Sequence, residues 1–229
     1  MKHLLIFLML ISVWGCAEKK KEKALSQTEP AEVSEKGPEI INNEVDYDVS
    51  QWLEITEEDG VVLDIRYATS NNFTKNQIYD CGRCFLRPEL AKRIKTLQKD
   101  ISQRYGMKLK LFDCYRPRPA QQKLWDIVPD EKYVTNPAKG SMHNRGLAVD
   151  ITLVNKDGEE LDMGTAFDHF GVEAHTVNRN LPDEILKNRD ILTKLMEVHG
   201  LKGITSEWWH FSLKTVQAPL DDWVWPCDV

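Results

Sequence analysis

The spacing of apolar residues predicts two long helices, and these helices constrain the fold more than any other feature of the sequence. Between Pro88 and Gly106, apolar side chains recur every three to four positions, and a proline at the start and a glycine at the end are typical of helix boundaries. Residues 183–199 repeat this spacing, and a shorter helix is expected at residues 120–127. Each long helix has one apolar face and therefore needs a partner surface in a core.

Short strands are predicted around these helices, but strands and helices do not alternate regularly. Residues 108–114 alternate between polar and apolar side chains, residues 146–153 contain several β-branched residues, and residues 208–213 are mostly aromatic or apolar. A doubly wound parallel sheet requires regular alternation of strand and helix. The sequence therefore predicts an α+β fold in a single domain, with a mainly antiparallel central sheet and flanking helices.

The N-terminal segment has the layout of a signal peptide. A basic start precedes an apolar run from Leu4 to Val13, which is too short to span a bilayer. Gly15 and Cys16 close this run and resemble the bacterial lipobox, in which the cysteine is acylated and becomes the new N-terminus. We expect residues 1–16 to be a lipoprotein signal peptide that ends in lipidation at Cys16, with simple cleavage as the alternative.

The next segment, residues 17–43, is polar and has no apolar periodicity or aromatic residues. Such a composition buries too little apolar surface to offset the entropy of ordering the chain, so we expect a disordered tether. Residues 44–229 are long enough for one domain with a substantial core. The expected location is the bacterial cell envelope, periplasmic or associated with the outer membrane, with membrane contact through the lipid anchor only.

The charge of the chain argues against a nucleic-acid partner. Its formal net charge is -6, and no basic cluster lies outside the tether. Proteins that bind nucleic acid present a basic patch to the phosphates, and this sequence has none in its expected domain. A small polar partner is expected instead.

Four cysteines lie in the expected domain: Cys81, Cys84, Cys114 and Cys227. In an exported protein an even number of cysteines favours disulfides, although the pairing cannot be read from the sequence. The pair Cys81 and Cys84 has the spacing of half a zinc ribbon, but the other two cysteines stand far apart. Disulfides or structural cysteines are therefore preferred over a metal site.

One segment combines an imidazole in a polar loop with a carboxylate in an apolar strand. His143 precedes Gly146, and Asp150 lies within the run AVDIT. A charge in such a strand is costly unless it is paired or bound to a cation. A metal ligand is one interpretation; the alternative is that Asp150 caps a loop or pairs with Arg145.

A second segment adds another imidazole and another carboxylate. Glu207 stands three residues before His210, with two tryptophans between them. Two histidines and one aspartate leave a fourth tetrahedral position open, which is the pattern of catalytic zinc, and a further glutamate is then free for acid–base chemistry. In a regular strand, residues three apart face opposite sides, so Glu207 and His210 share a site only if the strand is bulged or turns there. The alternative is an edge strand with a solvated histidine.

These two segments resemble a known family. The order S-x-H-x-x-G-x-A-x-D, followed downstream by E-x-W-H, is similar to the zinc D-alanyl-D-alanine dipeptidases, which belong with the lysostaphin/hedgehog-type metallopeptidases. The resemblance covers most of the chain from about Val61 to Leu213. It also includes the shorter matches Tyr67-Ala-Thr, Asn72-Phe-Thr, Tyr115-Arg-Pro, Met163-Gly and Phe167-Asp168.

The resemblance implies a catalytic centre with one zinc ion per chain. The implied zinc ligands are His143, Asp150 and His210. Glu207 would be the general base that acts on zinc-bound water, and Arg116 would stabilise the oxyanion of the tetrahedral intermediate. Because the loop here reads Tyr-Arg-Pro-Arg-Pro, Arg118 is an alternative for the oxyanion role. A salt bridge to Asp113 is the structural alternative for Arg116.

The resemblance also implies a substrate, the dipeptide D-Ala-D-Ala. Asp168 and Ser141 match positions that hold the free amino group of the substrate, and Tyr67 matches a position that lines the pocket. The expected role is the turnover or scavenging of cell-wall peptides. Two alternatives stay open, a D,D-carboxypeptidase or peptidoglycan endopeptidase on the same fold, and a non-catalytic zinc-binding module.

Overall fold

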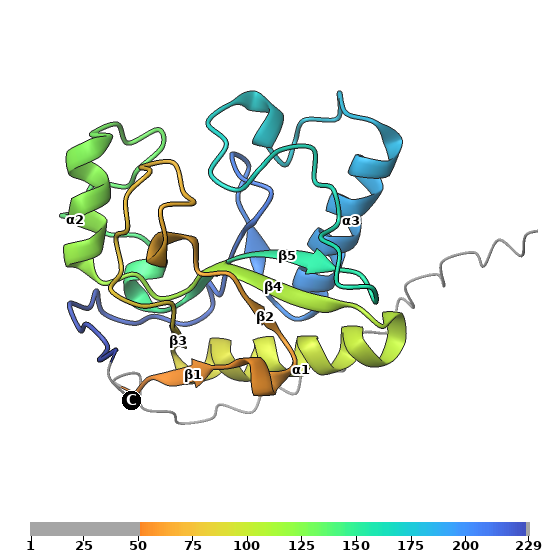
Figure 1. Ribbon diagram of the computed structural model, residues 1–229, viewed down its shortest axis with the longest axis horizontal. Helices are drawn as coiled ribbons and strands as arrows, with labels where there is room; N and C mark the ends of the chain where they lie inside the picture. Colours follow the sequence, from red (N-terminus) through yellow and green to blue (C-terminus); the bar gives the residue numbers. More distant parts are fainter. Residues whose placement is uncertain (1–50, 228–229) are drawn as a thin grey trace, which may run out of the picture. The chain divides into compact units, whose positions relative to one another are not determined.

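The computed structural model of the chain describes residues 51–227 (Figure 1). The signal peptide, the lipidation at Cys16 and the tether predicted from the sequence lie outside these residues, as do the two ends of the expected domain. Within the described part of the chain, no helix is both long enough and apolar enough to cross a bilayer.

The described residues contain three α-helices at the predicted places. They are α1 (Pro88–Tyr105), α2 (Arg118–Ile127) and α3 (Asp183–Val198). The apolar face predicted for α1 is fully buried, and the helix ends where Gly106 adopts a left-handed conformation with φ of 64°. The periodicity of the sequence thus identified which face of α1 enters the core.

The central sheet has five strands in the order β2-β4-β5-β7-β6. Their bounds are Val62–Leu63 for β2, Lys108–Asp113 for β4, Ala148–Val154 for β5, Lys202–Gly203 for β6 and His210–Ser212 for β7. The pair β2 and β4 is parallel, and the other three pairs are antiparallel. The predicted α+β fold with a mainly antiparallel sheet is confirmed, and the edge strand β2 makes the sheet mixed.

Smaller elements complete the fold. Strands β1 (Leu53–Ile55) and β3 (Cys84–Leu86) form a separate antiparallel pair. Four single 3-10 turns are present, at Glu57–Asp59, Arg66–Ala68, His143–Arg145 and Val172–Ala174. In Figure 1, α1 runs along the lower side of the sheet, whereas α2 and α3 stand on opposite sides of the view. Strand β5 lies in the middle of the sheet, and all seven of its residues are buried.

Two disulfides join the four cysteines. Cys84 on β3 pairs with Cys114, directly after β4, and Cys81 pairs with Cys227 near the end of the chain. The second bond closes a long loop of sequence, which in the chain-entropy account stabilises the fold by restricting the unfolded chain. It also holds a C-terminal segment whose Trp225 packs against Tyr79 and Phe85.

Candidate active site

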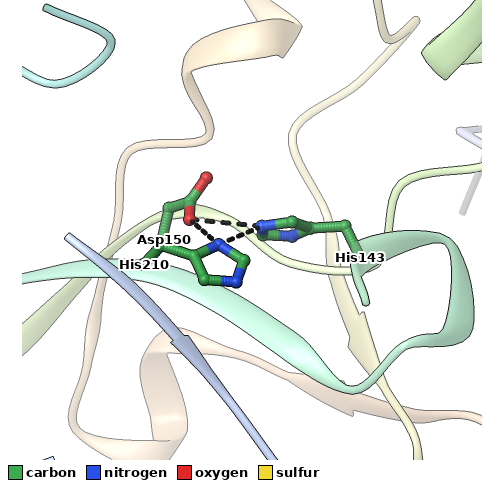
Figure 2. A group of neighbouring side chains, drawn as sticks. All are labelled: His143, Asp150 and His210. Carbon is green, nitrogen blue, oxygen red and sulfur yellow. Dashed lines mark hydrogen bonds and ion pairs between the residues drawn. The ribbon is translucent and has the colours of Figure 1, made fainter. Parts of the chain in front are cut away.

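Three buried side chains from the two sequence segments that carry the family resemblance converge beside the central sheet. Asp150 on β5 and His210 on β7 are paired residues of neighbouring strands, so their side chains leave the sheet next to each other. His143, on a 3-10 turn, reaches them from outside the sheet (Figure 2). Asp150 Oδ1 lies 3.2 Å from His143 Nε2 and 3.0 Å from His210 Nδ1, and the two ring nitrogens are 3.0 Å apart.

This donor set fits a zinc ion. The other ring nitrogen of His143, Nδ1, lies 2.7 Å from the backbone carbonyl of Cys114, which can only accept a hydrogen bond. That contact keeps the proton on Nδ1 and leaves the lone pair of Nε2 directed toward Asp150 and His210. Two imidazole nitrogens and one carboxylate oxygen therefore converge on one point, which is a ligand set of catalytic zinc sites.

The charges around this point are strongly coupled. Burial on its own would raise the pKa of the Asp150 carboxyl, but His143 and His210 beside it hold that pKa well below its usual range. Burial lowers the pKa of His143, and the charge of Asp150 outweighs this and raises it. Asp150 is therefore an ionised carboxylate in a buried place, which is favourable for a cation between these side chains.

Glu207 lies beside the three side chains in an irregular segment before β7. Its Oε2 is 3.9 Å from His210 Nδ1. Strand β7 begins only at His210, so the backbone before it is free to turn and the alternation of a regular strand does not apply. Burial raises the pKa of Glu207, while His210 opposes the shift. The geometry thus brings together the two residues whose spacing did not fit a regular strand.

Arg116 is held rigidly at the edge of this group. Its guanidinium donates hydrogen bonds to Asp113 Oδ2 at 3.0 and 2.7 Å and to Gln121 Oε1 at 3.0 Å. One of its nitrogens, Nη2, is 3.9 Å from Asp150 Oδ2. Arg118, in contrast, forms an exposed ion pair with Asp222. Arg116 thus forms the salt bridge to Asp113 that was the structural alternative, and it also faces the site. Arg118 points to Asp222 instead.

A single cavity of about 500 Å³ connects all these groups. Its walls include every catalytic, metal-ligating and substrate-binding residue predicted from the sequence: Tyr67, Arg116, Ser141, His143, Asp150, Asp168, Glu207 and His210. The Tyr67 hydroxyl donates a hydrogen bond of 2.9 Å to Asp168 Oδ2. Burial raises the pKa of Asp168, and the charge of Asp150 adds to the shift. A cationic ligand group beside Asp168 would therefore favour its ionised form.

Three buried polar residues support the site; the sequence had suggested Asp113 as a partner of Arg116, but it had not predicted Gln121 or Asn144. Asp113 and Gln121 orient Arg116, as described above. Asn144 accepts a hydrogen bond from the Ser141 amide at 2.7 Å and donates one to the Arg116 carbonyl, also at 2.7 Å. The sequence signal for a supporting role of Asn144 is its position directly after His143 in a polar loop. Asn144 thus links the loop of Ser141 to the loop of Arg116.

Comparison with known proteins agrees with this geometry. The model of the peptidase family described as D-ala-D-ala dipeptidase matches residues 54–225. The chain belongs to this family. The family resemblance predicted from the two sequence segments is confirmed, and membership makes the protein a metallopeptidase of the dipeptidase class.

Relatives within the family cover most of the described chain. The D-alanyl-D-alanine dipeptidase of Escherichia coli (strain K12) is 40% identical over 153 residues, which is 66% of this chain and 78% of that protein. The D-alanyl-D-alanine dipeptidase of Enterococcus faecium is 32% identical over 181 residues, which is 70% of this chain and 89% of that protein. A solved structure of a vancomycin resistance D,D-dipeptidase, VanXYg, with a D-Ala-D-Ala phosphinate analogue aligns with a TM-score of 0.34 at 18% identity, over 71% of this chain and 67% of that chain.

Proposed function

We propose that this dipeptidase hydrolyses D-Ala-D-Ala to free D-alanine, with one zinc ion held by His143, Asp150 and His210. The observation that carries the proposal is the set of side chains that line the cavity described above. It joins a buried three-ligand set to a nearby glutamate, a fixed arginine and, on another loop, the carboxylate of Asp168. The names of the two relatives described above favour this substrate.

The side chains of the cavity have separate roles in the hydrolysis. His143, Asp150 and His210 would hold the zinc ion, which when bound would act as a Lewis acid and lower the pKa of water toward neutrality. Glu207 accepts the proton of the attacking water and passes it to the amine nitrogen as the peptide bond breaks. Arg116, fixed by Asp113 and Gln121, stabilises the negative charge that develops on the carbonyl oxygen.

Asp168 accounts for a preference for dipeptides. Its carboxylate and the Tyr67 hydroxyl face the cavity as a pair that receives the ammonium group of the substrate. Ser141, on the cavity wall, contributes a further polar contact. A longer peptide has an uncharged amide in place of this ammonium and would leave the buried carboxylate without a cationic partner.

Replacing Asp168 by alanine tests this assignment. We expect the KM for D-Ala-D-Ala to rise about 10- to 100-fold, since a hydrogen bond to a charged group is worth about 1.5–3 kcal/mol. Cleavage of the same dipeptide with an acetylated amine should change little. Release of D-alanine by the zinc-loaded protein is the measurement, and Asp157→Ala, which alters an exposed aspartate outside the cavity, is the control.

A comparison of substrates on the wild-type protein separates the alternatives. A cavity of about 500 Å³ is within the range that encloses drug-sized ligands, roughly 300–1,000 Å³. A D,D-carboxypeptidase or endopeptidase on this fold is therefore the second candidate, and it would cleave pentapeptide stems faster than the free dipeptide. If no D-amino-acid peptide is cleaved, the result would favour a non-catalytic zinc-binding module.

We also propose that the protein is exported and anchored in the cell envelope through a lipid on Cys16. The two disulfides support an oxidising compartment. An exported enzyme meets periplasmic or extracellular peptides, so its role would be wall turnover or scavenging. Cys16→Ser is expected to move the protein from the membrane fraction to the soluble fraction. An unchanged membrane fraction in this variant would argue against the anchor.

A further inference from the structure

Arg189 is a charged residue on the apolar face of α3. It lies four positions after Ile185 and three before Leu192, and Met196 follows on the same face. Its side chain is only 3% exposed. Among the ion pairs of the described residues, none involves Arg189. A buried charge without a carboxylate partner is costly, so its hydrogen bonds have to compensate for the lost contact with water.

All the hydrogen bonds of this guanidinium go to backbone carbonyls of one segment. Nε donates to the Met163 carbonyl at 2.8 Å, Nη2 to the Glu173 carbonyl at 2.8 Å and Nη1 to the His175 carbonyl at 3.1 Å. These acceptors lie at the two ends of residues 163–175. One rigid planar group on α3 therefore fixes the distance between both ends of the segment.

Asp168 stands in the middle of this segment in an unusual backbone conformation. Its φ is 61°, in the left-handed region that residues other than glycine rarely adopt. Such a conformation costs about 1–3 kcal/mol and persists only where the surroundings enforce it. Phe167, the preceding residue, packs against Phe112 and Trp209. The hydrogen bonds of Arg189 to residues 163, 173 and 175, which we call the clamp, and the aromatic contacts of Phe167 hold the backbone on both sides of Asp168, and Tyr67 contacts its carboxylate.

We propose that Arg189 is a positioning residue for substrate binding, which acts by holding residues 163–175 so that Asp168 faces the ammonium group of the dipeptide. The inference rests on the proposed dipeptidase function and extends it to a residue that does not line the cavity. It requires that loss of the clamp weaken binding of the substrate and leave zinc binding and the bond-breaking step largely unaffected.

The test is the conservative variant Arg189→Lys, which keeps the charge but cannot reach three carbonyls at once. We expect the KM for D-Ala-D-Ala to rise at least about tenfold, because a misplacement of about 1 Å costs up to 10²-fold. We expect kcat to stay within about threefold and the zinc content to be unchanged. Arg179→Lys, which alters an exposed arginine paired with Asp190, is the matched control and should leave both constants unchanged.

A double-mutant cycle distinguishes positioning of Asp168 from a general structural role. If Arg189 acts through Asp168, Arg189→Lys should raise KM by less than about twofold in an Asp168→Ala background. An equal rise in both backgrounds would contradict the inference. Should Arg189→Lys fail to fold, Asn188→Ala replaces it, because the Asn188 amide donates a hydrogen bond of 2.9 Å to the carbonyl of Asp162, the residue directly before the same segment. A smaller rise in KM is expected for that variant, and no rise would overturn the proposal.

Failure of this inference can be told apart from failure of the proposed function. Binding of D-Ala-D-Ala is measured by calorimetry in a zinc-loaded Glu207→Gln protein, in which turnover does not interfere. In that background, Arg189→Lys should weaken binding and raise the Kd at least about tenfold. An active wild type with an unchanged Kd in the variant refutes the role of Arg189. A wild type that neither binds nor cleaves the dipeptide refutes the proposed substrate, and the role of Arg189 with it.

Discussion

Replacing Glu207 by glutamine is expected to lower kcat for D-Ala-D-Ala about 10³-fold and to leave the zinc content unchanged. General acid–base catalysis contributes about 10²–10⁴-fold, and glutamine keeps the shape of the side chain but cannot accept the proton. Glu207 is the carboxylate beside the three-ligand set that is not itself part of the set. Burial raises the pKa of Glu207, which makes its carboxylate a stronger base than a carboxylate in water.

Steady-state kinetics together with metal analysis decide this prediction. The matched control is Glu184→Gln, which alters an exposed carboxylate on α3 and should leave kcat unchanged. A glutamine variant that retains wild-type kcat at full zinc content would refute the role of Glu207 as the base. A variant that loses zinc would instead assign Glu207 to the ligand set.

The helices and the middle of the sheet were predictable because their signals are local. The apolar positions of α1 are separated by three or four residues, and β5 is apolar except at Asp150 and Thr152, so each pattern lies within one short window. Strands β2 and β6 have only two residues each. Such strands have no measurable period, and they exist because distant partners supply their hydrogen bonds. The sequence therefore predicted a mainly antiparallel sheet but not its parallel edge at β2.

The site was partly predictable for a related reason. His143 and Asp150 are close in sequence, and Asp150 is a charge in an apolar strand, so both are visible as exceptions to their surroundings. The placing of Glu207 beside His210 depends on where β7 begins, and that is set by pairing with β5 rather than by local preference. The spacing of Glu207 and His210 alone therefore could not predict that both side chains face the same site.

Arg189 is a residue whose burial has a signal in the sequence. A helix whose apolar face contains Ile185, Leu192 and Met196 also places position 189 on that face, so the arginine there interrupts the pattern. An interruption of this kind indicates a buried charge that needs partners. The partners themselves are backbone carbonyls of another segment, and no side-chain pattern in the sequence identifies them.

Asp150→Asn is expected to weaken zinc binding by more than about 100-fold and to abolish hydrolysis at ordinary zinc concentrations. Asp150 is the anionic member of the ligand set, and the two histidines that remain are neutral ligands. Nη2 of Arg116 lies 3.9 Å from Asp150 Oδ2, so the variant also loses one of the two carboxylates that offset this positive charge near the metal and keeps only Asp113. Loss of outer hydrogen-bond partners alone costs about 10–100-fold in metal affinity, so loss of the ligand charge should cost more.

Zinc affinity can be measured without activity, through competition with a chromogenic chelator and through thermal unfolding. A ligand that binds the native state stabilises it by RT ln(1 + [L]/Kd), so added zinc should raise the Tm of the wild type and have little effect on Asp150→Asn. Asp64→Asn, at a half-buried carboxylate that pairs with Arg66 and Lys110, is the matched control. Because Asp150 binds His143 and His210 on neighbouring elements, an Asp150→Asn protein with wild-type zinc affinity would mean that the metal is held elsewhere. The convergence of these three side chains would then be a buried polar network, stabilised by the charge of Asp150 rather than by a cation.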